Sequence, residues 1–577
     1  MNNAAAALSG LKLQSWRSRL LLAVILLWMV GLIARALYLQ GLHNDFLRQK
    51  GDARVSRVIE ISAHRGMITD RSGEALAIST PVESVWASPA DVELAPGQLK
   101  QLARLLGADP DELGRRLSDT RRDFVYLKRQ MPPEQAAQVM ELGIPGVFPR
   151  HEYRRYYPAG DVMAHVLGFT NVDDQGQEGL ELVYQDWLAG KPGSHRVLKD
   201  ARGHIIEDVE SLKTPEQGRE LALSVDLKIQ YLAYRELEKA VAEHRAKAGG
   251  VVVLDARSGE ILALANLPSY NPNNRVKLNR ERMRNRAITD IFEPGSTLKP
   301  FTAAAVLEAG TFKADSLIQT APGYFSIGPA TIHDAHPQGL ITVAQVIQKS
   351  SNVGAAKMAL SLSPEYLWNV LNRVGFGTVP HAGFPGEASG KLRPFQTWRP
   401  IEQATMSYGH GISVSLLQLA RAYGVFANDG ELSPLSMLKL SAPRAGSQAF
   451  SPAVARAVRD MLEMAVQPGG TAPYAQVAGY RVAGKTGTAH KLENGAYAAD
   501  RYVASFVGMA PASNPRLIIA VMIDEPGAGK YYGGTVAAPV FANIMAGALR
   551  MLSIPPDAPT NNIVLPPAGA PEVREVV

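Results

Sequence analysis

The chain has 577 residues, of which 46% are hydrophobic and 20% are charged, and its formal net charge is +6. This length exceeds what one hydrophobic core usually accommodates, so we expect two or more folded domains. The excess of positive charge is too small and too diffuse for a nucleic-acid-binding protein. The sequence contains no cysteine, which excludes a disulfide framework, a cysteine-ligated metal and a thiol nucleophile.

An apolar stretch near the N-terminus predicts a membrane anchor. The residues from Leu20 to Ala34 are uninterruptedly apolar, and the run resumes after Arg35 and continues to Leu39. Residues 20–40 therefore provide about the twenty residues that a membrane-spanning helix needs. Arg35 is compatible with such a helix, because its long side chain can reach the membrane surface or face a partner helix.

The charges before this stretch predict its orientation. Lys12, Arg17 and Arg19 precede it, so the positive-inside rule places residues 1–19 in the cytoplasm and the rest of the chain across the membrane. A cleaved signal peptide is the alternative, because the Ala-Arg-Ala sequence at 34–36 has the small-x-small form of a cleavage site. The charge inside that site and the apolar residues directly after it favour an uncleaved anchor.

The sequence from residue 41 to residue 225 is mixed in character and interrupted by turns. Arg65 to Gly73 indicates a strand and a turn, and two stretches have the periodicity of short amphipathic helices, Pro96 to Leu117 and Pro132 to Leu142. The aromatic and basic residues from Tyr153 to Pro158 are typical of a packed loop with stacked arginines rather than of a ligand site. No catalytic pattern lies here, so we predict a mixed α/β domain that acts as a spacer or docks partners.

Residues 226–555 predict an α+β domain. Asp226 can cap a helix from Leu227 to about His244, and a hairpin formed by Gly249 to Asp255 and Glu260 to Asn266 follows it. From Ser296 to about Ala427 the pattern is largely helical. Strand-like runs return at Tyr480 to His490, Tyr502 to Met509 and Leu517 to Asp524.

The order of these elements predicts the arrangement of the domain. Because strands occur at both ends and helices between them, we expect one antiparallel sheet, built from both ends of the segment and flanked by helices. Residues 556–577 are rich in proline and alanine, and we predict a flexible tail there.

One stretch of this domain combines a nucleophile with a base. In the sequence from Glu293 to Lys299, Ser296 follows a Pro-Gly break and Lys299 comes three residues later. Residues i and i+3 lie on one face of a helix, so the serine hydroxyl and the lysine amine can form a hydrogen bond. Pro300 has no N–H, which indicates a tight or irregular first turn. The motif alone is weak, because Ser-x-x-Lys also occurs at Ser9 and Ser436.

Two further motifs follow along the chain. Ser350-Ser351-Asn352 comes after a helical segment and can direct a hydroxyl and an amide to the same space. Lys485-Thr486-Gly487 lies on the first of the late strands and offers a cation and a hydroxyl to an anionic group. Gly487 inside a strand indicates the close approach of another backbone or of a ligand. The N–H of Thr488 can supply an oxyanion donor beside that of Ser296.

The three motifs, in this order, resemble the S-x-x-K, S-x-N and K-T-G motifs of the penicillin-recognising serine acyltransferases. The resemblance extends over nearly the whole chain, and the further stretches that look like the class B penicillin-binding proteins are Arg65 to Gly73, Arg155-x-Tyr157-Pro158, Gly179 to Glu181 and Tyr408 to Gly411. That class carries an N-terminal anchor and a non-catalytic pedestal before a serine β-lactamase/transpeptidase-like domain. The length and the anchor are most similar to its cell-division members, of the FtsI type.

The resemblance implies a D,D-transpeptidase that cross-links peptidoglycan stem peptides ending in D-Ala-D-Ala and is inhibited by β-lactam antibiotics. It implies that Ser296 is the nucleophile, that Lys299 is its base when neutral, and that Ser350 relays the proton to the leaving amine. It also implies that Asn352 holds the acyl substrate. Substrate binding would involve the strand residues Lys485, Thr486, Gly487 and Thr488.

The resemblance further implies surroundings and partners. No metal or cofactor is required. The chain is expected to be a single-pass protein of the bacterial inner membrane, with a periplasmic catalytic domain at the division septum. Its expected partners are an FtsW-type glycosyltransferase and other division proteins.

Several other functions remain open at this point. An elongation-type transpeptidase, a D,D-carboxypeptidase and a β-lactamase share these motifs, although no residue matches the hydrolytic glutamate of class A β-lactamases. The non-enzymatic alternatives are a β-lactam sensor and a silent division scaffold. A sensor is expected to carry further membrane spans and an output domain, and a scaffold is expected to have lost Ser296, Lys299 or Lys485.

Overall fold

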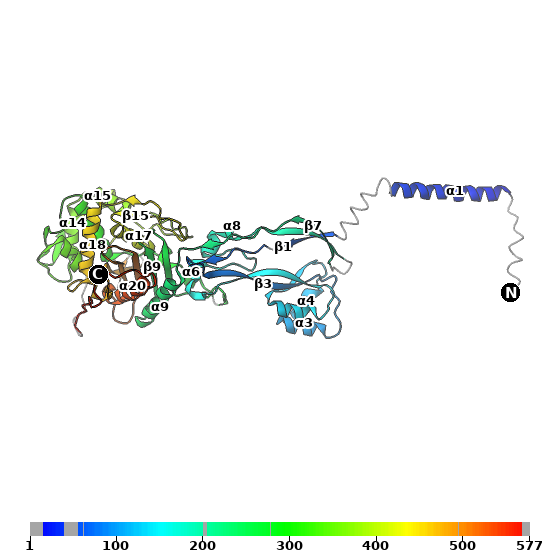
Figure 1. Ribbon diagram of the computed structural model, residues 1–577, viewed down its shortest axis with the longest axis horizontal. Coiled ribbons are helices and arrows are strands. Elements are labelled where there is room, and N and C mark those ends of the chain that lie inside the picture. Colours follow the sequence, from blue (N-terminus) through cyan, green and yellow to red (C-terminus); the bar gives the residue numbers. More distant parts are fainter. Residues whose placement is uncertain are drawn as a thin grey trace. The chain divides into compact units, whose positions relative to one another are not determined.

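We analysed a computed structural model of the chain, which describes residues 15–39, 56–61, 63–199, 205–276, 278–493 and 496–567 (Figure 1). The chain divides into two compact units. The first unit comprises residues 1–63, 82–152 and 191–216, and the second comprises residues 64–81, 153–190 and 217–577. The boundary between residues 225 and 226 stays a prediction, since three segments of the expected pedestal belong to the second unit.

The N-terminal apolar stretch forms one helix, α1 (Ser15–Leu37). In the described part of the chain, α1 is the one helix that is long and apolar enough to cross a membrane, and its residues are exposed. It begins five residues before the predicted span at residue 20, because arginine and serine at 15–19 are compatible with a helix. The guanidinium of Arg35 lies 5.6 Å from the centre of the Tyr38 ring. Lys12 and residue 40 lie outside the described residues.

The first unit contains a three-stranded antiparallel sheet and a small helical core. The sheet has the order β1 (Ser56–Ile61), β6 (Gly193–Lys199), β7 (Ile205–Lys213). The predicted helices are confirmed as α3 (Gln98–Leu106), α4 (Pro110–Ser118) and α5 (Pro133–Met140). They share a core with β4 (Val125–Met131) and the end of β3 (Ala75–Ala87). The predicted helix at 96–117 is two helices, because Gly107 adopts a left-handed conformation with φ of 60° and ends α3.

The aromatic and basic segment at 153–158 is not the loop that we predicted. Residues up to Tyr156 belong to β5 (Val147–Tyr156), which pairs with β3, because alternating bulky side chains favour a strand. Arg155 does not stack but is buried, and its Nε donates to Glu181 at 2.6 Å. Arg65 Nε donates to the other carboxylate oxygen of Glu181 at 2.7 Å. These three side chains form a buried ion cluster, which we call the Arg65–Arg155–Glu181 cluster.

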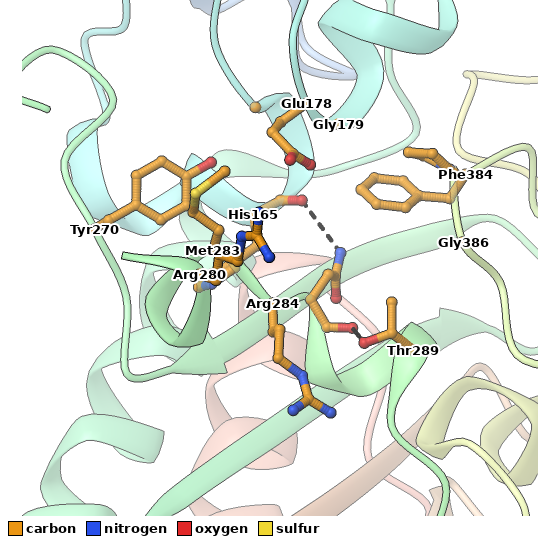
Figure 2. A pocket seen from close by; sticks show the side chains of 13 residues that line it. His165, Glu178, Gly179, Tyr270, Arg280, Met283, Arg284, Thr289, Phe384 and Gly386 are labelled. Atoms are coloured by element: carbon orange, nitrogen blue, oxygen red, sulfur yellow. Dashed lines mark hydrogen bonds between the residues drawn. The ribbon is translucent and has the colours of Figure 1, made fainter. Parts of the chain in front are cut away.

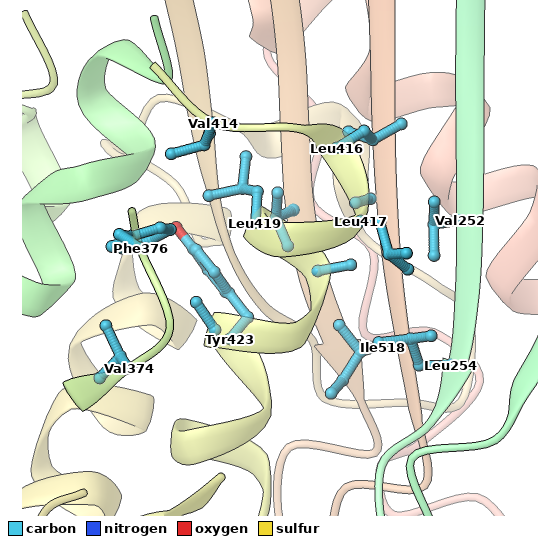
Figure 3. Packing of buried hydrophobic residues seen from close by; sticks show 14 of the residues in the cluster. Val252, Leu254, Val374, Phe376, Val414, Leu416, Leu417, Leu419, Tyr423 and Ile518 are labelled. Carbon is cyan, nitrogen blue, oxygen red and sulfur yellow. The ribbon is translucent and has the colours of Figure 1, made fainter. Parts of the chain in front are cut away.

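The second unit is organised around a five-stranded antiparallel sheet, as predicted. Its order is β10 (Ile261–Leu267), β9 (Ala248–Asp255), β19 (Leu517–Asp524), β18 (Ala496–Ala510), β17 (Ala483–Glu493). Neighbouring residues of one strand point to opposite faces. Accordingly, Ile518 packs with α17 (Leu416–Ala427) on one face, whereas Ile519 packs with α9 (Leu227–Glu243) and α20 (Ala538–Met551) on the other. Figure 3 shows Ile518 next to Leu254 of β9 and below Leu417 of α17.

The region between the outer strands is largely helical, as predicted, with three short strand pairs added. The helices are α12 (Lys299–Glu308), α13 (Val343–Lys349), α14 (Asn352–Leu360), α15 (Pro364–Arg373), α16 (Pro400–Met406), α17 and α18 (Pro452–Val466). The strand pairs are β11 (Leu317–Gln319) with β14 (Leu340–Thr342), β12 (Tyr324–Ile327) with β13 (Ala330–His333), and β15 (Glu431–Leu432) with β16 (Ser447–Gln448). Phe301 fixes α12 in the core, where its ring lies 5.2 Å from that of Phe376 and 5.6 Å from that of Tyr423.

The remaining elements are short. Before the sheet they are β2 (Ile68–Thr69), η2 (Gly160–Val162), α6 (Ala164–Leu167), α7 (Gly179–Val183), α8 (Gln185–Leu188) and β8 (Leu221–Ala222). After β10 they are α10 (Arg280–Met283), α11 (Arg286–Thr289), η3 (Gly295–Leu298), η4 (Phe395–Thr397), η5 (Pro473–Ala475) and α19 (Gly533–Val536).

The flexible tail expected at residues 556–577 stays a prediction, but residues 557–564 form hydrogen bonds with other parts of the second unit. Asp557 accepts hydrogen bonds from the Arg481 backbone N–H at 2.8 Å and from the Ser513 hydroxyl at 2.6 Å. The Asn562 amide donates to the Tyr480 carbonyl at 2.8 Å. Two polar side chains of this segment, Asp557 and Asn562, therefore bond to groups that are distant in the sequence. Residues 568–577 lie outside the described residues.

Candidate active site

Ser296 lies in a tight turn that two glycines clamp. The turn is η3, a 3₁₀ turn directly before α12, which confirms the irregular first turn predicted from Pro300. A Cβ at Gly409 would lie 2.2 Å from the Gly295 carbonyl oxygen, and a Cβ at Gly487 would lie 2.7 Å from the Pro294 carbonyl oxygen. Only glycine allows such approach, so the loop at 408–411 and strand β17 fix the position of Ser296.

The hydroxyl of Ser296 meets two groups of the predicted site. Lys299 Nζ donates to Ser296 Oγ at 2.8 Å, and Ser350 Oγ donates to the same oxygen at 3.0 Å. Lys299 Nζ also contacts Ser350 Oγ at 3.0 Å and the Ser350 carbonyl at 2.7 Å. Lys299 is fully buried. We call these three side chains the Ser296–Lys299–Ser350 triangle; its short distances allow a proton to pass among an amine and two hydroxyls.

Ser350 has a strained backbone conformation, and this conformation positions its hydroxyl and its carbonyl beside Lys299. Ser350 follows the end of α13 and adopts φ of 61°, the left-handed conformation that residues other than glycine, asparagine and aspartate rarely adopt. The capping box at Thr342 begins α13, and the Ser351 hydroxyl accepts a hydrogen bond from Gly354 N–H at the start of α14. Helices fixed on both sides therefore hold Ser350 in place.

Asn352 lies at the start of α14, close in sequence to the triangle but bonded elsewhere. Its amide donates to the His333 carbonyl at 3.3 Å, on β13. The structure thus anchors Asn352 to the edge of the site, and its expected contact with substrate stays a prediction.

The strand motif lies on β17 with its polar groups buried. Lys485 Nζ donates to the Thr486 hydroxyl at 3.0 Å, and the Thr486 and Thr471 hydroxyls are 2.9 Å apart. Thr488 accepts a hydrogen bond from Gly533 N–H at 3.1 Å. The backbone of Thr488 lies beside the serine turn, since a Cβ at Gly295 would be 3.0 Å from the Thr488 carbonyl oxygen. The close approach predicted at Gly487 is confirmed, since a Cβ there would lie 2.5 Å from the Ser505 hydroxyl oxygen and 2.7 Å from the Pro294 carbonyl oxygen.

Glu293, Tyr497 and Thr471 also belong to the site, although no motif in the sequence indicated them. One Glu293 oxygen accepts from the Gly411 N–H at 2.8 Å, and the other accepts from the Tyr497 hydroxyl at 2.9 Å. Burial raises the pKa of Glu293 above its ordinary value. Glu293 thus ties the serine segment to the loop at 408–411 and to the hairpin of β17 and β18. No local pattern signals these contacts, because the partners are more than a hundred residues away.

His410 lies next to this set as a neutral imidazole. Burial, followed by the charge of Lys299 and of His490, lowers the pKa of His410 to about 4. The His410 ring contacts those of Tyr408 and Tyr497, with centroids 5.2 Å and 5.9 Å apart. The site therefore joins a buried amine, two hydroxyls and a neutral aromatic wall, an arrangement suited to covalent acyl transfer.

Comparisons with known proteins agree with this geometry. Residues 249–546 match a family model described as the penicillin-binding protein transpeptidase domain, and residues 60–223 match one described as the penicillin-binding protein dimerisation domain. The match to the transpeptidase model includes all three motifs.

Relatives match over nearly the full chain. Peptidoglycan D,D-transpeptidase FtsI of Escherichia coli is 44% identical, covering 95% of this chain and 93% of its own. The probable peptidoglycan D,D-transpeptidase PenA of Neisseria meningitidis is 45% identical, covering 94% of each chain. Among solved structures, the TP domain of penicillin-binding protein 3 from Burkholderia pseudomallei is 49% identical with a TM-score of 0.55, covering 58% of this chain and 98% of that domain.

Proposed function

Since the chain belongs to the penicillin-binding protein transpeptidase family, we propose that it is the septal peptidoglycan D,D-transpeptidase, acting through an acyl-enzyme at Ser296. The predicted class B resemblance is confirmed by the two family models and by the identity to FtsI. The observation that carries the proposal is the Ser296–Lys299–Ser350 triangle, whose distances lie between 2.8 and 3.0 Å.

The acylation step follows from the triangle. Ser296 Oγ attacks the carbonyl carbon of the penultimate D-Ala and passes its proton to a neutral Lys299 Nζ, which lies 2.8 Å away. Ser350, within 3.0 Å of both groups, then relays a proton to the nitrogen of the departing D-Ala. The peptide C–N bond breaks, and a Ser296 ester of the stem peptide remains.

The surrounding groups stabilise the charges that develop. The N–H groups of Ser296 and Thr488 would bind the oxyanion, each worth about 3–4 kcal/mol. Lys485, with the hydroxyls of Thr486 and Thr488, would bind the terminal carboxylate. Asn352 would hold the acyl part of the donor. An amine on a second stem peptide then attacks the ester by the reverse sequence of proton transfers, and a cross-link forms.

A cross-linking assay tests this function. The full chain in detergent is incubated with a stem-peptide donor and an amine acceptor, and released D-Ala and cross-linked dimer are quantified. We expect both products from the wild type and neither from Ser296→Ala. Retention of cross-linking by Ser296→Ala would contradict the proposal. Release of D-Ala without dimer would identify a D,D-carboxypeptidase instead.

We also propose the location and partners implied by the sequence. Residues 1–19 lie in the cytoplasm, α1 crosses the inner membrane, and residues 41–225 form a pedestal that positions the catalytic domain of residues 226–555 in the periplasm. The exposed apolar surface of α1 and Arg35 would contact an FtsW-type glycosyltransferase or other division proteins.

An anchor exchange tests these membrane contacts. Replacing residues 20–39 by an unrelated span should leave penicillin acylation intact but impair septation at normal expression. Normal septation would reduce α1 to a tether. Cells that round up rather than filament on depletion would favour the elongation-type alternative.

A further inference from the structure

The second unit contains a pocket that the proposed acyl transfer does not use. Its volume is about 440 Å³, within the range of small-ligand sites. It lies among α6, the start of α7, α10, α11 and the loop around Phe384 (Figure 2). None of its lining residues belongs to the motifs of Ser296, Ser350 or Lys485.

Most polar groups in the walls are already satisfied. His165 Nε2 donates to the Arg282 carbonyl at 2.7 Å, and burial lowers the pKa of His165 to about 4, so its ring is neutral. The Tyr270 hydroxyl donates to the Ala164 carbonyl at 3.0 Å. The Asn285 amide donates to the His165 carbonyl at 3.1 Å, one of the bonds drawn in Figure 2. These bonds make the walls a fixed and largely neutral frame.

Two charged side chains of the pocket differ from this frame. Glu178 is half-buried at the start of α7, and Arg280 is exposed on α10. Over the described residues, neither side chain forms a hydrogen bond or an ion pair. By contrast, Arg284, which also lines the pocket, donates to Asp290 at 2.6 Å. Figure 2 shows Glu178 pointing into the pocket from above, with Arg280, Met283 and Arg284 below it.

Burial supports the view that Glu178 lacks compensation. Desolvation raises the pKa of its carboxyl above the ordinary value. A carboxylate and a guanidinium that share a pocket without pairing can each bind an opposite charge from a ligand. Met283, Tyr270 and Phe384 supply apolar surface between them.

We propose that this pocket binds a zwitterionic end group, either an amino acid or a short peptide with a free amine and a free carboxylate. The ligand's ammonium group donates to Glu178, and its carboxylate accepts from Arg280. Its side chains pack against Met283 and Phe384. A ligand without an ammonium group leaves Glu178 unpaired in its partly desolvated position. A ligand without a carboxylate loses the charge-assisted hydrogen bond from Arg280, so each of the two ligands binds more weakly.

Calorimetric titration with three related peptides tests the site. The probes are trialanine, N-acetyl-trialanine and trialaninamide, added to the full chain in detergent after the catalytic serine has been blocked with benzylpenicillin. We expect saturable binding of trialanine, and about tenfold weaker binding of each derivative because each loses one charge-assisted hydrogen bond. The penicillin adduct is checked by intact mass, so failure of the proposed acylation is seen separately from failure of this site.

Variants identify which side chain reads which charge. Glu178→Gln should weaken trialanine about tenfold and abolish its advantage over the N-acetyl peptide, while keeping its advantage over the amide. Arg280→Gln should also weaken trialanine about tenfold, but it should abolish the advantage of trialanine over the amide and keep its advantage over the N-acetyl peptide. Glu243→Gln and Lys313→Gln, exposed changes of the same charge outside the pocket, should leave all affinities unchanged. Circular dichroism and cooperative unfolding show that each variant is folded.

Several outcomes would overturn the proposal. They are the absence of saturable trialanine binding below about 10 mM, equal affinity for all three peptides, and unchanged affinity in both pocket variants. Binding that Glu178→Gln and Arg280→Gln weaken equally for every peptide would also contradict it, because each side chain is assigned to one end of the ligand.

Discussion

Two buried polar clusters of the second unit contain basic side chains, but the groups that surround these side chains differ, and so do their roles. In the Arg65–Arg155–Glu181 cluster, two guanidinium groups donate to one carboxylate at 2.7 and 2.6 Å. In the Ser296–Lys299–Ser350 triangle, the lysine amine contacts two hydroxyls and a carbonyl at 2.7 to 3.0 Å. A guanidinium beside a carboxylate stays charged and holds the fold, whereas an amine between hydroxyls can exchange a proton with them.

The largest expected effect comes from changing the amine of the triangle. Lys299→Arg keeps a positive charge but removes the group that can become a neutral base, so we expect folded protein with at least about a thousandfold slower penicillin acylation. Stopped-flow acylation rates measure this, with Lys313→Arg as an exposed control. A near-normal rate in Lys299→Arg would show that Lys299 is not the base.

The equivalent change in the ion cluster should affect stability instead. Glu181→Gln leaves Arg65 and Arg155 buried without their carboxylate, which we expect to lower the free energy of unfolding by about 3–5 kcal/mol. Glu216→Gln is the control, since it breaks an exposed pair with Lys191 and should cost at most about 1 kcal/mol. Denaturant unfolding measures both. Similar losses in the two variants would remove the distinction between the clusters.

Two substitutions at Ser350 distinguish the role of its hydroxyl in proton transfer from the effect of its strained backbone. Ser350→Ala should slow acylation about a hundredfold, and Ser350→Gly should slow it equally while tolerating φ of 61° better. The matched variant controls for strain. If the glycine variant acylates at the wild-type rate, the hydroxyl has no part in proton transfer.

A smaller effect concerns pH and Asp174, which lies beside the ion cluster. Burial is the main cause that raises the pKa of Asp174 to about 6 from 3.8, and its Oδ1 has no hydrogen-bond partner in the described part of the chain. The Asp174 carboxyl therefore binds its proton more tightly in the folded state than in the unfolded state. The stabilisation that this proton gives to the folded state is lost as pH rises from about 4 through 6.

Asp174→Asn tests this sign. The amide cannot ionise, and asparagine tolerates the left-handed φ of 59° at this position. We expect the free energy of unfolding of the variant to exceed that of the wild type by about 2 kcal/mol at pH 7. This difference should shrink towards pH 4. A destabilised variant at pH 7 would mean that the carboxylate favours the fold.

The sequence predicted the fold and the site correctly where the signal is a local apolar pattern or a set of short motifs in a fixed order. Alternating and continuous apolar runs predicted β9, β10, β17, β18 and β19, and the order of three short motifs predicted the triangle at Ser296. The contacts of Glu293 with Tyr497, of Thr471 with Thr486 and of Asn562 with Tyr480 were not predictable. Each joins segments that only the folded sheet brings together, and a single sequence carries no periodic signal for such pairs.

The strand at 153–156 shows a different cause of error. Its arginines and aromatic residues indicated a packed loop with stacked arginines, because a charged side chain is rarely buried without a partner. The partner, Glu181, lies in a short helix that the sequence did not predict. The Arg65–Arg155–Glu181 cluster could therefore be identified only from the structure.

The most direct test of the account is the position of the covalent adduct. The full chain is treated with benzylpenicillin, digested and analysed by mass spectrometry. We predict a single penicilloyl group on Ser296, absent from Ser296→Ala while that variant remains folded. Ser436 carries the same Ser-x-x-Lys string but is 3% exposed and donates to the Leu438 carbonyl at 2.8 Å. An adduct on Ser436, on Ser9 or on any other serine would contradict the assignment of the triangle as the catalytic centre.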